Sequence, residues 1–238
     1  WLNEKYAADI SKVMREILKN CSKRISLCMI VSDKEHPRTL MRCLESVKDW
    51  VDEINIVFNY KHLMKIPVFL NGKANYPRKF LGIARDLDAK GIYHNFEYKK
   101  WTNFSEMRNQ SLKIASCDYC LWLDADDVMD APWRLKDFVT FYPEADYFTC
   151  DVLSYTETGT KELILHNRLF KNGKGYEFRN SVHEDVSFSM LEKKAVRQKA
   201  NITIHHLGNT SWDYVVKKNE RNYRLILKDI EKPEAHSL

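Results

Sequence analysis

Leu121-Trp122-Leu123-Asp124-Ala125-Asp126-Asp127 is an apolar run that ends in three carboxylates within four residues. Because successive side chains of a strand point to opposite faces, we expect Asp124 and Asp126 to project to the same side. Two carboxylates this close repel each other unless a cation lies between them, and oxygen ligands favour Mg²⁺ or Mn²⁺ over zinc. The alternative for this pattern alone is an acidic turn in which Asp127 caps the next helix.

Length and composition favour one large globular domain or two closely packed halves. The chain has 238 residues, 44% of them hydrophobic and 12% aromatic, which is enough to bury a substantial core. No apolar run approaches the ~20 residues of a membrane-spanning helix, and the N-terminus lacks the apolar core of a signal peptide. A cytoplasmic protein without a transmembrane segment is therefore expected. The net charge of +5 permits an anionic partner without requiring one.

The cysteines and the clustered basic residues are interpreted as structural. Cys28 and Cys120 lie inside apolar runs, which is typical of buried thiols in a reducing compartment. Cys117 and Cys120 form a close pair without a second Cys or His pair at zinc-finger spacing, so we interpret them as core residues. Basic residues concentrate at 193–199 and 217–224. We interpret these as solvated faces, with a nucleic-acid or phosphate patch as the alternative.

The first half of the chain alternates between strand and helix patterns. Apolar strands at 25–31 and 53–58 flank a helical pattern at 39–50, and this βαβ arrangement indicates a parallel sheet. The other elements expected here are an amphipathic helix at 3–19, strands at 66–70, 92–99 and 119–123, a turn at 71–72, and helices at 78–90 and 105–115. Since ligands of open α/β sheets collect beyond the carboxyl ends of strands, the polar loop after Val31 and the acids after Leu123 are candidate site segments.

The pattern changes after Pro132. The elements expected there are antiparallel strands at 145–155 and 162–170, a turn between them at 156–159, a last strand at 202–206 and a helix at 212–230. The expected fold class is therefore α/β, with a mixed, mainly parallel sheet flanked by helices and a smaller antiparallel region.

Three groups of segments follow one another in a recognisable order. They are 25–31 with Asp33-Lys34-Glu35 and Arg42-Cys43-Leu44-Glu45-Ser46-Val47; Asn103-Phe104-Ser105-Glu106-Met107-Arg108-Asn109 leading into Trp122-Leu123-Asp124-Ala125-Asp126-Asp127; and Arg168-Leu169-Phe170-Lys171-Asn172, Val182-His183-Glu184-Asp185 and His205-His206-Leu207-Gly208. Together they resemble the inverting glycosyltransferases of family 2, in particular its short bacterial and phage-type members. The resemblance covers about 25–58 and 92–210.

This resemblance implies a Rossmann-like GT-A fold and inverting transfer of a sugar from a nucleotide sugar. It also implies a division of roles along one integrated domain. The expected parts are an N-terminal helix at 1–24, a nucleotide-sugar-binding half at 25–130, an acceptor-side and catalytic half at 131–210, and a C-terminal helix at 211–238.

The resemblance makes the acidic run the DXD metal-binding motif. Sugar transfer builds negative charge on the leaving diphosphate, and a divalent cation, Mn²⁺ or Mg²⁺, offsets that charge. Asp126 is the expected direct ligand, and Asp124 is expected to face the ribose or to reach the metal through water. His206 is the expected histidine ligand, with His205 and His183 as alternatives.

Inverting transfer also needs a catalytic base. One carboxylate takes the acceptor's proton as the acceptor attacks the anomeric carbon, a contribution of roughly 10²- to 10⁴-fold in rate. Glu184 is the first choice for this base and Asp185 the second. The alternative is a surface acidic pair at the end of a strand.

Five further residues are expected to bind the nucleotide sugar. Arg108 can pair with phosphate through two hydrogen bonds, and Asn109 can orient nearby polar groups. Asp33, Glu35 and Asn59 lie in the polar segments that follow the first two strands.

The sequence departs from the usual family pattern on the donor side. Phe58 stands where relatives usually carry an aspartate that helps to hold the base, so Asn59 or Tyr60 is expected to replace that contact. The stretch from 59 to 100 is also longer than in typical relatives. The expected donor is still a UDP-sugar, with UDP-glucose as the first choice.

The acceptor and two other functions stay open. The acceptor is expected to be a peptide, a polysaccharide or a hydroxymethylated base in DNA, and the basic segments slightly favour a polyanion. A nucleotidyltransferase that makes an activated sugar is one alternative, although 32–37 contains no glycine for a phosphate loop. A non-catalytic nucleotide- or glycan-binding relative is the other.

Overall fold

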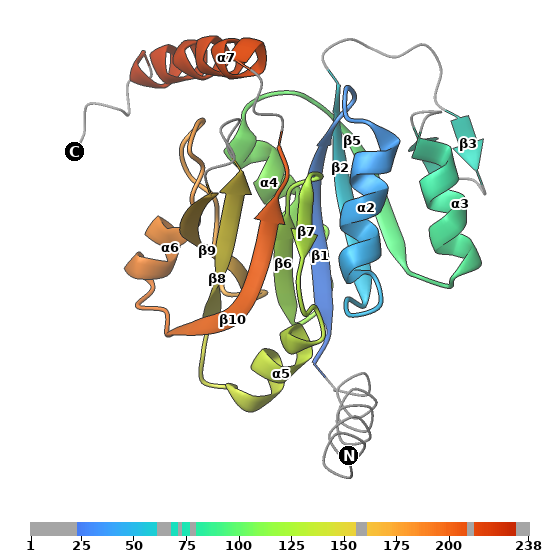
Figure 1. Cartoon of the computed structure of the whole chain (residues 1–238), viewed down its shortest axis with the longest axis vertical. Helices are drawn as coiled ribbons and strands as arrows, with labels where there is room; N and C mark the ends of the chain where they lie inside the picture. The colour runs from blue at the N-terminus through green and yellow to red at the C-terminus, as the bar shows by residue number, and fades with distance from the viewer. Residues whose placement is uncertain are drawn as a thin grey trace.

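An eight-stranded sheet forms the centre of the protein (Figure 1). The computed structural model describes residues 23–60, 68–70, 73–76, 80–155, 161–208 and 212–231. In spatial order the strands are β5 (His94–Lys100), β2 (Glu53–Tyr60), β1 (Ile25–Ser32), β6 (Tyr119–Leu123), β9 (Lys161–Lys171), β8 (Tyr147–Tyr155), β10 (Arg197–His206) and β7 (Asp127–Met129). Two short strands, β3 (Val68–Leu70) and β4 (Lys73–Tyr76), form a separate antiparallel pair.

Strand direction changes in the middle of the sheet. β5, β2, β1 and β6 are parallel to one another. β9 runs antiparallel to both β6 and β8, β10 is parallel to β8, and β7 is antiparallel to β10. Most neighbouring pairs are therefore parallel, and the predicted α/β class with a mixed sheet is confirmed.

Helices cover both faces of the sheet. The helices of the described structure are α2 (Pro37–Val47), α3 (Leu81–Ala89), α4 (Phe104–Lys113), α5 (Arg134–Phe141), α6 (Ser187–Glu192) and α7 (Trp212–Ile230), of which α7 lies beyond the end of the sheet (Figure 1). Successive residues of β1 pack into different cores, as the pleat of a strand requires. Leu27 and Met29 pack with residues of α2, α3 and α5, whereas Cys28 and Ile30 pack on the opposite face with residues of α6 and α4. The sheet is thus buried on both sides near the acidic run.

Local sequence sets the start of α4, the helix next to the site. Asn103 precedes the helix in an extended conformation, and its Oδ1 accepts a hydrogen bond from the backbone N–H of Glu106 at 2.8 Å. Asn103 Nδ2 in turn donates to the Glu106 carboxylate at 2.7 Å. This cap satisfies a free N–H of the first turn and adds a negative charge where the helix dipole favours one. It fixes where Arg108, one turn further on, enters the site.

The acidic run connects two distant parts of the sheet. β6 lies in the parallel region, but the strand that follows the turn, β7, pairs with β10, so that Asp127 lies opposite His206. β7 also lies against α2, where Ser46 Oγ accepts a hydrogen bond from the N–H of Met129 at 3.2 Å. Cys43 Sγ lies 3.4 Å from the carbonyl oxygen of Asp124. This crossing brings the end of β10 to the acidic turn.

The structure corrects several sequence-based expectations. Asp127 does not cap a helix, because it begins β7 and the next helix, α5, starts only at Arg134. The strands β4 and β7 and the helices α5 and α6 were not predicted, since they are too short to show a clear hydrophobic period. The predicted helix at 3–19 and the turns at 71–72 and 156–159 lie outside the described residues. The division of roles at 24, 130 and 210 stays a prediction.

The buried cysteines behave as expected. Cys28, Cys117 and Cys120 are free thiols, buried in the described structure, which confirms their interpretation as core residues. Among the described residues, no helix is both long and apolar enough to cross a membrane.

A buried carboxylate at the start of β2 joins three segments of the sheet. Glu53 is 3% exposed and accepts hydrogen bonds from Ser26 Oγ at 2.5 Å, Ser116 N–H at 2.9 Å and Ser116 Oγ at 3.1 Å. Burial alone would raise the pKa of Glu53, but the hydrogen bonds from Ser116 and Ser26 outweigh burial and lower it.

We therefore expect Glu53→Gln to destabilise the protein by about 1–3 kcal/mol at neutral pH. Because the folded-state pKa is lowered, the stabilisation is complete above the unfolded value of about 4.3 and is lost as pH falls through the folded value. Urea unfolding of both proteins at a series of pH values measures this. The difference in the free energy of unfolding between the wild type and Glu53→Gln should become smaller at acidic pH. Glu144→Gln, at an exposed glutamate, is the control and should show no such change. A constant difference at all pH values would contradict the account.

Candidate active site

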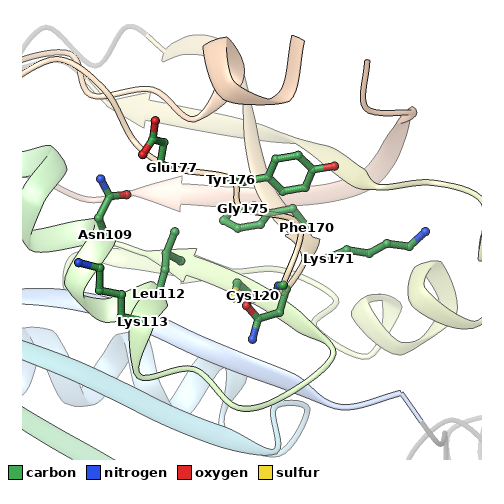
Figure 2. Close-up of a pocket in the computed structure, with 11 residues that line it drawn as sticks. Asn109, Leu112, Lys113, Cys120, Phe170, Lys171, Gly175, Tyr176 and Glu177 are labelled. Atoms are coloured by element: carbon green, nitrogen blue, oxygen red, sulfur yellow. Dashed lines mark hydrogen bonds between the residues drawn. The ribbon is translucent and has the colours of Figure 1, made fainter. Parts of the chain in front are cut away.

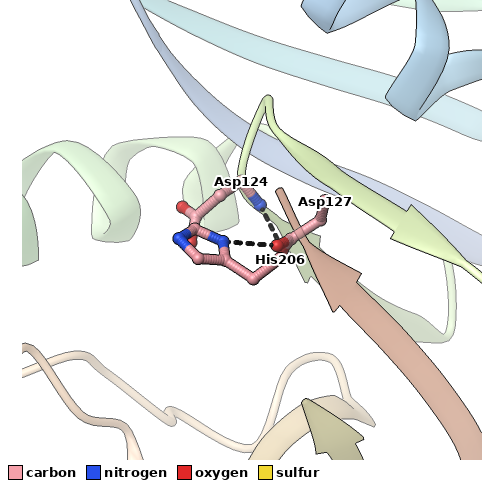
Figure 3. Close-up of side chains that lie close together, drawn as sticks. All are labelled: Asp124, Asp127 and His206. Atoms are coloured by element: carbon pink, nitrogen blue, oxygen red, sulfur yellow. Dashed lines mark hydrogen bonds and ion pairs between the residues drawn. The ribbon is translucent and has the colours of Figure 1, made fainter. Parts of the chain in front are cut away.

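Asp127 anchors the acidic turn. Asp127 is 0% exposed, and its Oδ2 accepts a hydrogen bond from the backbone N–H of Asp124 at 2.8 Å. Oδ1 lies 2.8 Å from Nδ1 of His206, and Oδ2 lies 3.0 Å from Nη1 of Arg168. Figure 3 shows the contacts of Asp127 with Asp124 and His206. Because a buried carboxylate is tolerated only when it is paired and hydrogen-bonded, these contacts define the shape of the turn.

Two arginines hold Asp124 in its ionised form. Its Oδ1 accepts a hydrogen bond from Arg108 Nη2 at 2.7 Å, and its Oδ2 lies 4.0 Å from Arg168 Nη1. Burial alone would raise the pKa of Asp124, but the charges of Arg108 and Arg168 hold it well below its usual range. These contacts therefore favour the ionised form of Asp124 at neutral pH.

Asp126 and His206 lie side by side, and the pKa values of both side chains are raised. Burial raises the pKa of Asp126 to about 6 against the opposing charge of His206, and the neighbouring Asp124 and Asp127 add to the rise. The hydrogen bond to Asp127 and the charge of Asp126 raise the pKa of His206 to about 9 despite burial. The Asp126 Oδ1 lies 3.6 Å from His206 Nδ1. At neutral pH the two side chains therefore form an ion pair.

Side chains at the turn can offer ligands to a cation. Asp124, Asp127 and His206 each place one ligand atom within 4.8 Å of the others. Asp126 adds a further oxygen near Gly208, where a Cβ atom would lie 2.9 Å from His206 Nε2 and 3.1 Å from Asp126 Oδ2. The structure thus places the predicted ligands Asp124 and Asp126 each near His206, while the third member of the closest group is Asp127 rather than Asp126.

Of the two alternative histidines, neither takes the place of His206. His205 points to other partners, with Nδ1 2.6 Å from the hydroxyl of Tyr155 and Nε2 2.7 Å from Oδ2 of Asp130. His183 is exposed in the loop that carries Glu184. His206 is therefore the histidine that lies at the acidic turn.

Arg108 connects the acidic turn to the predicted base. It is 5% exposed, and its Nε donates a hydrogen bond to Glu184 Oε1 at 2.8 Å while its Nη2 binds Asp124. Its guanidinium carbon lies 4.3 Å from the centre of the Trp122 ring, a cation–π contact. One guanidinium thus spans from the acidic turn to the candidate base. The predicted contact of Arg108 with phosphate stays a prediction.

A closed loop presents Glu184. Arg179 and Asp185 exchange two backbone hydrogen bonds, at 3.0 and 3.2 Å, and so close the loop at its base. His183, next to Glu184, has a φ of 54°, which a non-glycine residue rarely adopts. The Asp185 carboxylate accepts hydrogen bonds from the N–H and Oγ of Ser187 at 2.9 and 2.7 Å. The Asp185 carboxylate is therefore occupied by hydrogen bonds to Ser187, whereas the Glu184 carboxylate faces Arg108.

Three predicted nucleotide-binding residues lie at the carboxyl ends of β1 and β2. The Asp33 N–H donates to the Asn59 carbonyl at 3.1 Å, which places these two residues side by side. Glu35 follows in the same loop, and its N–H donates to the Ser32 carbonyl at 2.9 Å. No hydrogen bond or ion pair joins Asp33 or Asn59 to the acidic turn in the described part of the chain. Their contacts with a nucleotide stay predictions.

Asn109 and Phe58 serve the structure in ways that the sequence did not indicate. The side-chain amide of Asn109 donates through Nδ2 to the Phe178 carbonyl at 2.9 Å and accepts through Oδ1 from the Phe178 N–H at 2.7 Å, so this side chain holds the loop before Glu184. Phe58 is 1% exposed and stacks on Phe80 with ring centres 4.9 Å apart. Phe58 is thus part of the core. The predicted nucleotide-side role of Asn109 stays a prediction.

A cavity in the described structure lies away from the acidic turn. It has a volume of about 460 Å³ and opens between α4 and the end of β9. Figure 2 shows Leu112 and Cys120 at its centre, between Lys113 and Lys171. Asn109 is the one predicted site residue that lines it. We assign no catalytic role to this cavity, because it lacks the carboxylates and the histidine of the turn.

Sequence reasoning missed three residues of the site. Asp127 was treated as a cap, and Arg168 and Gly208 were quoted within motifs without a role. For Arg168 a signal was present, since an arginine next to Leu169-Phe170 in a buried strand needs a carboxylate partner. For Gly208 nothing in the sequence indicated that the residue lies next to Asp126 and His206 rather than in an ordinary turn.

Known proteins resemble the chain in sequence and in fold. It is 33% identical over 193 residues to the TPR repeat-containing protein Synpcc7942_0270 of Synechococcus elongatus, a match over 78% of this chain. The chain spans 42% of the length of that curated relative. Its fold is similar to that of the mannosyltransferase PcManGT from Pyrobaculum calidifontis, solved in complex with GDP-Man and Mn²⁺.

The structural match has a TM-score of 0.55 at 11% identity, and it covers 88% of this chain and 65% of that one. At this identity the likeness shows the fold alone, and it confirms the expected GT-A fold. Residues 73–201, more than half of the chain, match the sequence profile of glycosyl transferase family 2. The chain therefore belongs to glycosyl transferase family 2.

Proposed function

We propose that this protein is a metal-dependent, inverting glycosyltransferase that uses a nucleoside diphosphate sugar. Membership of family 2 supports the transfer of a sugar. The observation that carries the finer proposal is the arrangement of the acidic turn. Asp126 and His206 flank the space at Gly208, and Arg108 joins the same turn to Glu184.

The residues of the turn fit a divalent cation. His206 Nδ1 is bonded to Asp127, which leaves Nε2 as the ring nitrogen that can ligate, an arrangement common among metal-binding histidines. Nε2 and Asp126 Oδ2 both border the space that the missing side chain of Gly208 leaves open. Carboxylate oxygens with an imidazole suit Mn²⁺, and the mannosyltransferase of similar fold was solved with Mn²⁺. A bound cation would offset the charge that develops on the leaving diphosphate.

Glu184 is the proposed base. Its Oε1 is held by Arg108, so the carboxylate has a fixed direction, and Oε2 accepts no hydrogen bond from the described residues. In the proposed reaction Glu184 takes a proton from the acceptor as the acceptor attacks the anomeric carbon. The bond from that carbon to the diphosphate breaks, the nucleoside diphosphate leaves, and the configuration is inverted.

The donor and the acceptor are less narrowly defined. UDP-sugars, with UDP-glucose first, are the expected donors. GDP-mannose is the second donor to test, because the mannosyltransferase of similar fold binds it and Phe58 supplies no base-binding carboxylate here. A peptide, a polysaccharide and a hydroxymethylated DNA base remain the acceptors to test.

The test of this function is a calorimetric titration with Mn²⁺, followed by UDP or GDP. We expect nucleotide binding that depends on the metal, and we expect Asp126→Ala to abolish it because one ligand is lost. Asp49→Ala, at an exposed aspartate outside the site, is the control and should bind as the wild type does. Metal-independent nucleotide binding would favour the non-catalytic binding alternative, and no nucleotide binding at all would overturn the proposed function.

The role of Gly208 gives a second test. Its φ is outside the left-handed region, so alanine suits the backbone and acts only through its Cβ. Since that Cβ would lie 2.9 Å from His206 Nε2, we expect Gly208→Ala to weaken Mn²⁺ binding by about tenfold or more. Gly82→Ala is the matched control, because nothing lies within 4 Å of its Cβ position. Unchanged Mn²⁺ affinity in Gly208→Ala would place the metal elsewhere.

The role of Glu184 gives a third test. Glu184→Gln keeps the hydrogen bond from Arg108 but cannot take a proton, so we expect turnover to fall by about 10²- to 10⁴-fold with nucleotide binding preserved. Release of nucleoside diphosphate from each candidate donor measures turnover without a known acceptor. Glu177→Gln, at an exposed glutamate before the same loop, is the control. Normal turnover in Glu184→Gln would remove this residue as the base.

A further inference from the structure

Arg168 is a buried arginine with an unusual set of neighbours. It lies in β9, it is 2% exposed, and its guanidinium carbon is 3.7 Å from the centre of the Trp122 ring. Its Nη1 lies 3.0 Å from Asp127, 4.0 Å from Asp124 and 3.4 Å from the carbonyl of Trp122. Its Nε has no hydrogen-bond partner among the described residues. An arginine is rarely buried in this way unless it is paired with a carboxylate.

The two buried arginines of the site differ in what they hold. Arg108 divides its contacts between Asp124 and Glu184. Both ion pairs of Arg168 go to the acidic turn, and Arg168 alone contacts the fully buried Asp127 with a permanent charge among the described residues. Asp127 in turn orients His206 and accepts the N–H of Asp124. Arg168 thus supports the side chain, Asp127, on which these contacts depend.

We propose that Arg168 is a positioning residue that holds Asp124 and Asp127 in the arrangement that metal binding requires. It acts through these carboxylates and is not itself a ligand. The proposal rests on the proposed metal site. It predicts that removal of Arg168 changes the metal affinity in the direction opposite to that expected from its charge alone. A fixed positive charge near a cation site repels the cation, so removal of that charge would strengthen metal binding. If Arg168 positions the turn, its removal weakens metal binding.

The test is the affinity for Mn²⁺, measured by electron paramagnetic resonance of the free ion. We expect Arg168→Met to bind Mn²⁺ at least about tenfold more weakly than the wild type, as is usual when a residue that orients ligands is lost. Arg168→Lys keeps the charge but not the planar fork, so we expect an intermediate affinity. Arg197→Met, which removes a charge from the exposed start of β10, should leave the affinity unchanged. Equal or tighter binding in Arg168→Met would overturn the proposal.

Loss of folding is separated from loss of positioning in two ways. Circular dichroism and thermal unfolding show whether each variant is folded at the temperature of the titration. If Arg168→Met does not fold, Arg168→Lys decides, because unchanged affinity there also overturns the proposal. In Arg168→Ala we expect millimolar guanidinium to restore Mn²⁺ binding beside Trp122, whereas ammonium at the same concentration should not. Equal effects of the two ions would contradict the requirement for a planar fork.

The same experiment distinguishes this inference from the proposed function. If the wild type binds no Mn²⁺, the proposed metal site is wrong. If the wild type binds Mn²⁺ and Asp126→Ala does not, while the Arg168 variants bind as the wild type does, the metal site stands and the positioning role of Arg168 is wrong.

Discussion

The site depends on the burial of one charged carboxylate, that of Asp127. A carboxylate without access to water is costly unless every oxygen is paired. Asp127 meets this requirement with the backbone N–H of Asp124, with Arg168 of β9 and with His206 of β10. These partners lie just after β6, in β9 and in β10, so one side chain links three segments that are distant in the sequence. The same contacts orient His206 and shape the turn that carries Asp124 and Asp126.

This arrangement gives three neighbouring carboxylates three different properties. Asp127 is sealed in the interior and serves as a structural partner. The pKa of Asp124 is held well below its usual range by Arg108 and Arg168, against the effect of burial. Burial raises the pKa of Asp126 to about 6, and no arginine contacts it in the described structure. Asp126 is thus the carboxylate whose charge is least compensated by the protein, which is the property expected of a direct cation ligand.

Local sequence patterns predicted the part of the fold that depends on them. The continuous apolar character of β1 and the helical period of α2 indicated a parallel sheet, and the acids after β6 indicated a site at its carboxyl edge. They did not reveal that β7 leaves its chain neighbour and pairs with β10. Asp127 and His206 are 79 residues apart, and a three-residue strand has no period from which its partner can be inferred.

The burial of Phe58 and Arg168 could not be predicted for a related reason. A phenylalanine at the end of a strand fits both a ligand pocket and a core. Its stacking on Phe80 and Tyr98, which lie in later segments, decides in favour of the core. An arginine beside apolar residues indicates a buried partner but does not identify it. The candidate ligands and the candidate base were predicted through a family resemblance, whereas the residues that hold them in place required the three-dimensional structure.

Arg108 makes the acidic turn and the candidate base parts of one electrostatic unit. Its guanidinium is 5% exposed and binds Asp124 at 2.7 Å and Glu184 at 2.8 Å, so neither carboxylate can move without changing the other's partner. If Asp124 turns toward a cation or a ribose, its hold on Arg108 weakens and Arg108 is left to Glu184 alone. Binding on the donor side would then change the contacts of the base Glu184 through the side chain of Arg108. Because the loop of Glu184 is closed by Arg179 and Asp185, the base can respond to this change without the loop coming apart.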